Sequence, residues 1–303
     1  MKILRLATFA AMVLALPAAG QTWKVDKQIA CDFPGQKKHI NRQYDANGTR
    51  VFDLRITGAR GDSNVVITES GDYLIKSVPT RLQFLPEPVT TVLNSIFREP
   101  ANTSNLLERT TYQVDVEQVG QPPVRLEIDA TGRVRDITSA AQVAAELRSV
   151  VYEQVKWREG DEVSSKLAAY FENARIKEIR RNPGTPGFYY AELTADRGTR
   201  MIQIVMDSRK EIPVWKYQTR VDELPKPVLG TIKELVGRGK IGLIMKTKSS
   251  VYRIEQPVKD DTLVIDVKPT GDVVAVTGNL SQAAEERYIP RRGSDRVGDL
   301  RDR

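Results

Sequence analysis

The sequence predicts an α+β fold, in which tandem repeats build an antiparallel sheet and helices pack on one face of it. Three observations favour this class. Short segments such as Val124, Leu126 and Ile128 alternate with polar residues, as half-buried strands do. Longer segments such as residues 89–97 place apolar residues at helical spacing. Similar blocks of both kinds recur along the chain, which indicates a repeated unit.

The first twenty residues are typical of a signal peptide and are set apart from the fold. Lys2 and Arg5 flank the start of an apolar run at 6–16, and small residues at 18–20 precede a cleavage point. The run is shorter than the roughly 20 residues that a membrane-spanning helix needs. We therefore expect an exported chain, periplasmic or extracellular, whose mature sequence begins near Gln21.

Length and composition indicate a globular chain with more than one compact unit. The 303 residues are 40% hydrophobic and 28% charged, which supplies enough apolar material for a core. The formal net charge of +7 falls to +5 when Lys2 and Arg5 are removed, since 44 basic residues then face 39 acidic ones. Basic and acidic residues are interspersed, so nucleic-acid binding is not expected.

Two pairs of blocks match at a fixed offset of 139 residues. "LPEPVTTVLNSIF" (85–97) matches "LPKPVLGTIKELV" (224–236), and "LEIDATGRVRDIT" (126–138) matches "IDVKPTGDVVAVT" (265–277). Gly in the turn of the second pair suits a position of positive φ. These matches predict two copies of one unit, each a helix followed by short strands.

Two further copies are predicted from other offsets. Residues 187–215 match the unit around Tyr112 at an offset of 78, and residues 51–78 match it at an offset of 61. The larger offset implies an insertion of about 17 residues, which fits a helix at 139–155 with Ser139 and Gln142 as a capping box. Apolar stripes predict leading helices in the last three units, whereas the first unit lacks a clear one.

The units resemble the PepSY-like repeats, also called β-lactamase-inhibitor-like repeats, of exported bacterial proteins. The resemblance rests on the Leu-Pro-x-Pro-Val helix start and on "TYQVDVEQVGQPPVRLEIDATGRV" (111–134), and it covers roughly residues 45–278. It implies an antiparallel sheet with helices on one face, secretion, no cofactor, and binding to another protein or to envelope components. Pro213 departs from the pattern and predicts an edge strand or a bulge there.

These patterns divide the chain into seven segments. They are a signal peptide at 1–20, an N-terminal segment with the first β unit at 21–84, a PepSY-like repeat at 85–138, an inserted helix and linker at 139–162, two PepSY-like repeats at 163–222 and 223–278, and a charged mobile tail at 279–303.

The residue inventory favours a binding protein over an enzyme. Cys31 and His39 are the only cysteine and histidine, and they precede the first repeat, where a packed thiol and a surface imidazole are the ordinary explanation. No cluster has the spacing of a metal site. We therefore expect a non-catalytic binding protein without cofactor or metal, whose partner is another exported or envelope protein. A carrier or sensor of a small amphiphile, and a thiol enzyme using Cys31 and His39, remain as alternatives.

The expected binding surface is the solvated face of the sheet, because its side chains vary in charge without disturbing the core. Trp215 and Tyr217 are placed on this face by their parity with Ile212, unless Pro213 shifts the register. The candidate binding residues are Arg125, Glu127, Gln203, Val205, Trp215 and Tyr217.

The signal peptide gives a first prediction. N-terminal sequencing of secreted material should begin at or near Gln21, because the small residues at 18–20 fit the peptidase site. Secreted protein that retains Met1 would contradict this assignment.

Overall fold

The computed structural model describes residues 22–278, apart from 60, 98–102, 118–122, 140, 143–152, 155–156, 172, 182–186, 196–197, 210, 238 and 259–260. The expected signal peptide, most of the helix expected at 139–155 and the tail at 279–303 lie outside the described residues. The described part has an α+β fold dominated by one large antiparallel sheet, so the predicted class is confirmed. None of the described helices is long and apolar enough to cross a membrane.

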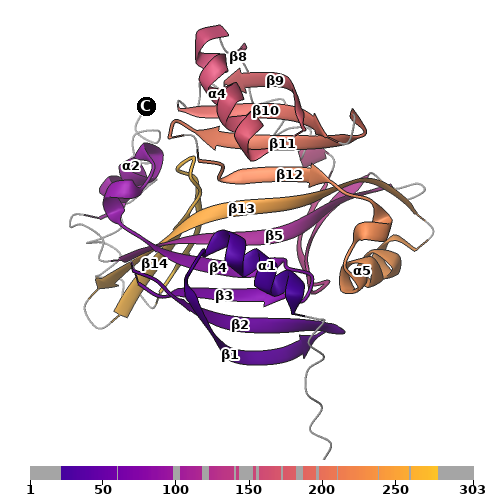
Figure 1. The fold of residues 1–303 in the computed structure, drawn as a ribbon, viewed down its shortest axis with the longest axis horizontal. Coiled ribbons are helices and arrows are strands. Elements are labelled where there is room, and N and C mark those ends of the chain that lie inside the picture. The colour runs from indigo at the N-terminus through magenta and orange to yellow at the C-terminus, as the bar shows by residue number, and fades with distance from the viewer. Residues whose placement is uncertain are drawn as a thin grey trace, which may run out of the picture.

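Two long strands form the centre of the sheet (Figure 1). Strand β5 (Thr103–Glu117) and strand β13 (Lys240–Val258) pair antiparallel along most of their length, with Arg109 opposite Ser249 near the middle. All other strands extend outward from this pair.

On both sides of the centre, each strand outward is the one that precedes its inner neighbour in the chain. From β5 the sheet continues through β4 (Tyr73–Thr80), β3 (Ser63–Thr68), β2 (Thr49–Thr57) and β1 (Lys37–Ala46). From β13 it continues through β12 (Val214–Gln218), β11 (Arg200–Asp207), β10 (Phe188–Ala195), β9 (Arg175–Arg181) and β8 (Glu153–Gln154). Each central strand also carries a hairpin, formed by β6 (Val124–Asp129) and β7 (Val134–Ser139) on β5 and by β14 (Asp261–Val267) and β15 (Val273–Thr277) on β13.

The described α-helices are distributed along the whole sheet. They are α1 (Trp23–Asp32), α2 (Glu87–Ile96), α4 (Trp157–Tyr170) and α5 (Lys226–Val236), and the short 3-10 helices η1 (Leu82–Phe84) and η3 (Val221–Glu223) precede α2 and α5. Figure 1 shows α1 in front of β3 and β4, and α4 in front of β10 and β11. At the start of the helix expected at 139–155, Ser139 and Gln142 form the predicted capping hydrogen bonds.

Helix α1 was not expected from the sequence. Its Val25 and Ile29 are buried against a cluster on β2, β3 and β4 that includes Leu54 and Tyr73. The helical spacing of Val25, Ile29 and Phe33 indicates this helix. The segment is short and its mean hydropathy is low, however, so the pattern is weak. Strands β2 to β4 thus have a covering helix, as do β10 and β11, on which Val163 and Leu167 of α4 are buried.

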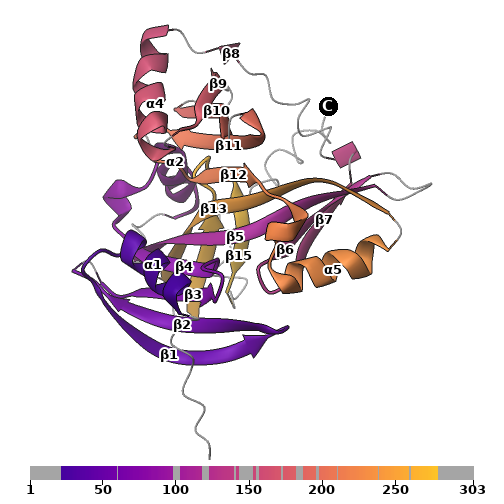
Figure 2. The same cartoon turned by 45° about the vertical axis from the view of Figure 1, so that its right-hand side comes forward.

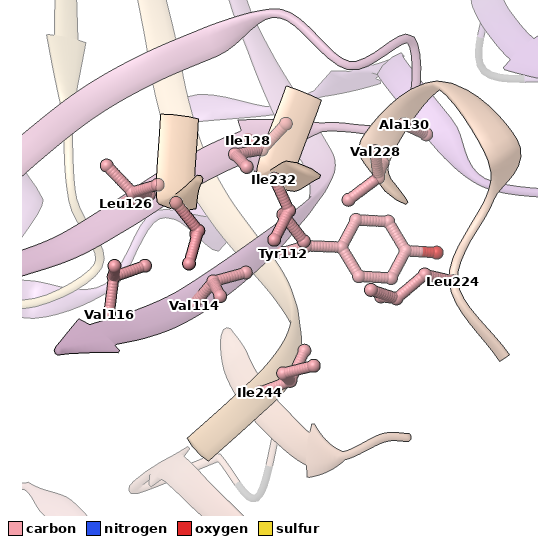
Figure 3. Close-up of a cluster of buried hydrophobic side chains, with 11 residues drawn as sticks. Tyr112, Val114, Val116, Leu126, Ile128, Ala130, Leu224, Val228, Ile232 and Ile244 are labelled. Carbon is pink, nitrogen blue, oxygen red and sulfur yellow. The ribbon is translucent and has the colours of Figure 1, made fainter. Parts of the chain in front are cut away.

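Helices α2 and α5 pack on each other's hairpins. Val89 of α2 is buried with residues of β13 and β14, including Ile265. Val228 and Ile232 of α5 are buried with residues of β5 and β6, including Leu126 (Figure 3). Each of the two helices thus covers mainly the hairpin that follows the other helix in the chain, and α5 also contacts Ile244 of β13. The reason is that β5 and β13 are antiparallel, which carries each hairpin to the side of the other helix.

Glycines allow the hairpin turns to approach these helices closely. At Gly132, φ is +83°, and a Cβ atom there would lie 2.6 Å from the carbonyl oxygen of Pro227. At Gly271, φ is +93°, and a Cβ atom would lie 3.1 Å from the carbonyl oxygen of Pro88. Both positions therefore exclude a larger residue, and both turns touch the first turn of the exchanged helix.

The same type of backbone hydrogen bond recurs in four turns. The amide of Thr68, Asp129, Asp207 or Lys268 donates to the carbonyl oxygen four residues later, over 2.8–3.0 Å. These turns lie 61, 78 and 61 residues apart, which are the offsets seen in the sequence. The tandem repeat itself stays a prediction.

Core and outward positions give the second prediction. The core set is Leu126, Ile204 and Ile265, and the outward set is Arg125, Gln203 and Val264. Each core residue is at most 4% exposed, so truncation to Ala should cost about 2–5 kcal/mol of unfolding free energy. Ala at each outward position should cost about 1 kcal/mol or less in the same denaturant melts. Equal costs in both sets would show that the register is wrong.

Candidate functional site

One face of the central strands points away from α4 and α5, and we call it the open face. On β5, Tyr112 and Val114 lie in the α5 cluster, so Thr111 and Gln113 point to the other side. On β11, Ile202 and Ile204 lie in the α4 cluster, so Gln203 and Val205 point away from that helix.

Strand register joins these positions into rows across the sheet. Residues that pair directly across antiparallel strands share one face. One row runs through Gln203, Lys216, Thr247 and Thr111. A second row runs through Tyr190, Val205, Val214, Ser249 and Arg109. The open face is therefore continuous from β10 to β5.

Two adjoining cavities hollow the open face. The larger has a volume of about 550 Å³, and the smaller has about 330 Å³. They share the lining residues Tyr190, Val205, Val214 and Lys216. Lys216 Nζ on β12 donates a hydrogen bond of 3.0 Å to Gln113 Oε1 on β5, which links these two strands across β13.

Four of the six candidate binding residues lie on this face. Glu127 lines the larger cavity, Gln203 the smaller one, and Val205 both. Arg125 lies beside them on β6, where its guanidinium makes a two-pronged ion pair with Asp115 at 2.7 and 3.1 Å. The structure thus brings these four predicted residues onto one surface, whereas their role in binding stays a prediction.

Trp215 and Tyr217 do not lie on the open face, and their predicted placement is wrong. They pair across the sheet with Ile204 and Ile202 and therefore share the face of these core residues. Both pack on the α4 cluster, as does Ile212. The alternation is broken at Pro213, whose carbonyl oxygen accepts the amide of Ser250 just before β12 begins at Val214. This is the shift of register that the proline made conceivable.

Neither Cys31 nor His39 lines the two cavities of the open face. Cys31 is on α1 and exposed, so the expected packed thiol is wrong. His39 is exposed on the edge strand β1, as expected of a surface imidazole. Among the described residues, no group of three His, Cys, Asp or Glu side chains has the arrangement of a metal site.

Sequence reasoning missed the residues at the centre of the open face. Arg109, Thr111, Lys216 and Thr247 all line the larger cavity. Their alternation with Thr110, Tyr112 and Trp215 was a usable signal, but only the β5–β13 pairing shows that Thr111 and Thr247 are neighbours.

A network of charged groups occupies the opposite face of the same strands. Lys76 Nζ lies 2.8 Å from Glu108 Oε2 and 3.4 Å from Asp32 Oδ2, and Lys248 Nζ lies 3.2 Å from Glu108 Oε2. The Tyr73 hydroxyl donates to Asp32 Oδ2 over 2.6 Å. The network ties α1 and β4 to β5 and β13, which indicates a structural role.

The network shifts the pKa values of its members. Burial by itself raises the pKa of Asp32, but the Tyr73 hydrogen bond and the charges of Lys76 and Lys248 outweigh it, so the pKa lies below its ordinary value of 3.8. Burial and the Asp32 carboxylate raise the pKa of Tyr73 well above its ordinary value. Tyr73 therefore remains a protonated donor at all physiological pH values.

Comparison with known proteins gives no family assignment. No family model matches the chain, and no curated protein matches it. A BLIP-like protein from Bacteroides fragilis is similar over 40% of this chain and 86% of its own, with 15% identity and a TM-score of 0.25. The C-terminal domain of YpeB from Bacillus megaterium is similar over 86% of this chain and 98% of its own, with 14% identity and a TM-score of 0.19. At these TM-scores neither likeness carries an argument, and the resemblance to PepSY-like repeats stays a prediction.

Acid unfolding gives the third prediction. A carboxyl group with a lowered pKa in the folded state stabilises the fold above its ordinary pKa and loses this contribution as pH falls through the folded value. The stability gap between wild type and Asp32→Asn should therefore be largest near pH 7 and should narrow below about pH 4, set by the ordinary pKa of 3.8. Urea melts between pH 7 and pH 2 measure the gap.

The matched control is Asp222→Asn, which changes an exposed carboxylate on η3. Its free energy of unfolding should run parallel to that of wild type from pH 7 to pH 2. A gap for Asp32→Asn that stays constant with pH would contradict the ionic role of this carboxylate.

Proposed function

We propose that the protein is a non-catalytic exported binding protein of the PepSY-like type, built of tandem repeats with their helices on one face of the sheet. The open face contacts its partner, which is another exported or envelope protein. The observation that supports this most directly is the open face itself, a continuous sheet surface with two adjoining cavities on the side away from α4 and α5.

The chemistry of the open face suits protein recognition. Gln203 and Arg109 are exposed, while Val205 and Val214 are half-buried beside the cavities, so polar and apolar contacts alternate. Protein interfaces combine an apolar centre with a polar rim, and a recess lets a partner side chain be desolvated. Substitutions at these positions leave the opposite, helix-covered core intact.

A carrier or sensor of a small amphiphile is the second candidate. The larger cavity favours it, because about 550 Å³ lies within the range of small-molecule sites. A carrier, however, encloses its ligand in mostly apolar walls. Arg109, Gln113, Glu127 and Lys216 in the lining fit a surface that meets a protein better.

Site-specific photo-crosslinking tests the proposed surface and gives the fourth prediction. A benzophenone amino acid in place of Gln203, exposed on the open face, should form a discrete adduct with an envelope protein. The adduct should weaken in a Lys216→Glu background, because the reversed charge lies in the wall of both cavities. Melting temperatures should stay within a few degrees of wild type, as expected for exposed or half-buried positions.

The matched control places the same amino acid at Lys233, which is exposed on α5. An adduct from position 233 but none from 203 would place the partner on the helices and contradict the proposal. Turnover of a hydrolase substrate that stops in Cys31→Ser or His39→Ala would show an enzyme instead.

A further inference from the structure

We propose that the larger cavity of the open face binds a carboxylate together with an adjacent apolar side chain, supplied by a short acidic segment of the protein partner. This inference rests on the proposed function, since it takes the open face as the contact surface. It adds the chemistry by which the partner is recognised.

The charges in the cavity wall favour an anion. Four cationic residues and two carboxylates line it, namely Arg109, Arg135, Lys216, Lys268, Glu127 and Asp129. The lining therefore carries a net positive charge, which attracts carboxylates.

One pair of these charges is already neutralised. Arg135 Nε donates to Asp129 Oδ2 over 2.8 Å. The other oxygen of Asp129 accepts the amide and the hydroxyl of Thr131 and the amide of Arg133. Both carboxylate oxygens of Asp129 thus already have hydrogen-bond partners, and its charge is paired with Arg135 and not with the other cations.

Two of the remaining cations lack a counter-ion. Within the described part of the chain, neither Arg109 nor Lys268 makes an ion pair. They come from different places in the fold, Arg109 from the middle of β5 and Lys268 from the turn between β14 and β15. An incoming carboxylate would be held by charge-assisted hydrogen bonds, which are stronger than neutral ones.

The floor of the cavity suits the rest of a peptide. Leu107, Val214 and Pro269 supply apolar surface. Thr111 and Thr247 lie directly opposite each other, are 5% and 4% exposed, and have no hydrogen-bond partner for their hydroxyl oxygens among the described residues. A buried hydroxyl without a partner costs about 1–3 kcal/mol, and a small rotation would let it bond a peptide group.

The shape favours a peptide segment over a free amphiphile. A cavity of about 550 Å³ holds a few residues, and the smaller cavity continues it along the sheet through four shared lining residues. An extended segment can follow this direction, with its ends leaving over the polar open face. A free alkyl chain in the same cavity would instead contact the polar side chains of Gln113, Glu127 and Ser249, which do not suit it.

Calorimetric titration with matched blocked peptides tests the proposal. The probe is acetyl-Leu-Asp-Phe-amide, and its neutral counterpart carries Asn in place of Asp. We expect the acidic peptide to bind roughly tenfold tighter, as one charge-assisted hydrogen bond implies. The preference should shrink in high salt and should disappear in the double variant Arg109→Gln and Lys268→Gln.

The control variant is Lys233→Gln, which removes an equal kind of charge from α5 and should keep the preference. Equal binding of the two peptides to wild type, or a preference that survives the double variant, would overturn the assignment. Decanoate that binds tighter than the acidic peptide and also depends on Arg109 and Lys268 would overturn the peptide in favour of a free amphiphile.

The two proposals fail separately. If crosslinks form at position 203 but the peptides are not distinguished, only the carboxylate site is wrong. If the partner crosslinks through position 233 instead, the proposed contact surface is wrong, and the cavity's role in recognising that partner falls with it.

Discussion

The antiparallel pairing of β5 with β13 is the interaction on which the rest of the structure depends. These are the longest strands of the described fold, and together they connect strands β1 to β4 with strands β8 to β12 in one sheet. Because they run in opposite directions, the hairpin that follows each strand lies beside the helix that precedes the other. The exchange of α2 and α5 is thus a consequence of strand direction. Figure 2 shows α5 beneath β6, close to the hairpin that it covers.

The two faces of this central pair differ in how their charges are paired. On the helix side, Lys76 and Lys248 share the carboxylate of Glu108, which joins β4 to both central strands. A partly buried network of this kind is stable when each charge has a partner, and here the charges alternate in sign. On the open side, Arg109 and Lys268 line a cavity and make no ion pair with the residues that the structure describes. This contrast between satisfied and unsatisfied charge, on the same strands, distinguishes the structural face from the candidate binding face.

Much of the local structure could be predicted from the sequence, because its causes are local. Alternation at Leu126 and Ile128 sets which side of β6 is buried, and Gly132 marks a turn that needs positive φ. Helices α2 and α5 begin with Pro in the first turn, where its fixed φ fits. The exchange of these helices depends on long-range pairing, for which no local signal exists. Trp215 was misplaced because one proline changes the alternation, and parity counted across Pro213 then gives the wrong face.

Helix exchange can be measured directly by double-mutant cycles in the intact chain. In these cycles Val89→Ala is combined with Ile265→Ala or with Leu126→Ala, and the free energy of unfolding is compared with the sum of the single changes. We expect a coupling of about 0.5–3 kcal/mol between Val89 and Ile265, which share a cluster, and additivity within about 0.5 kcal/mol between Val89 and Leu126, which do not. Coupling of Val89 to Leu126, with additivity toward Ile265, would show that each helix covers its own hairpin and would contradict the exchange of α2 and α5.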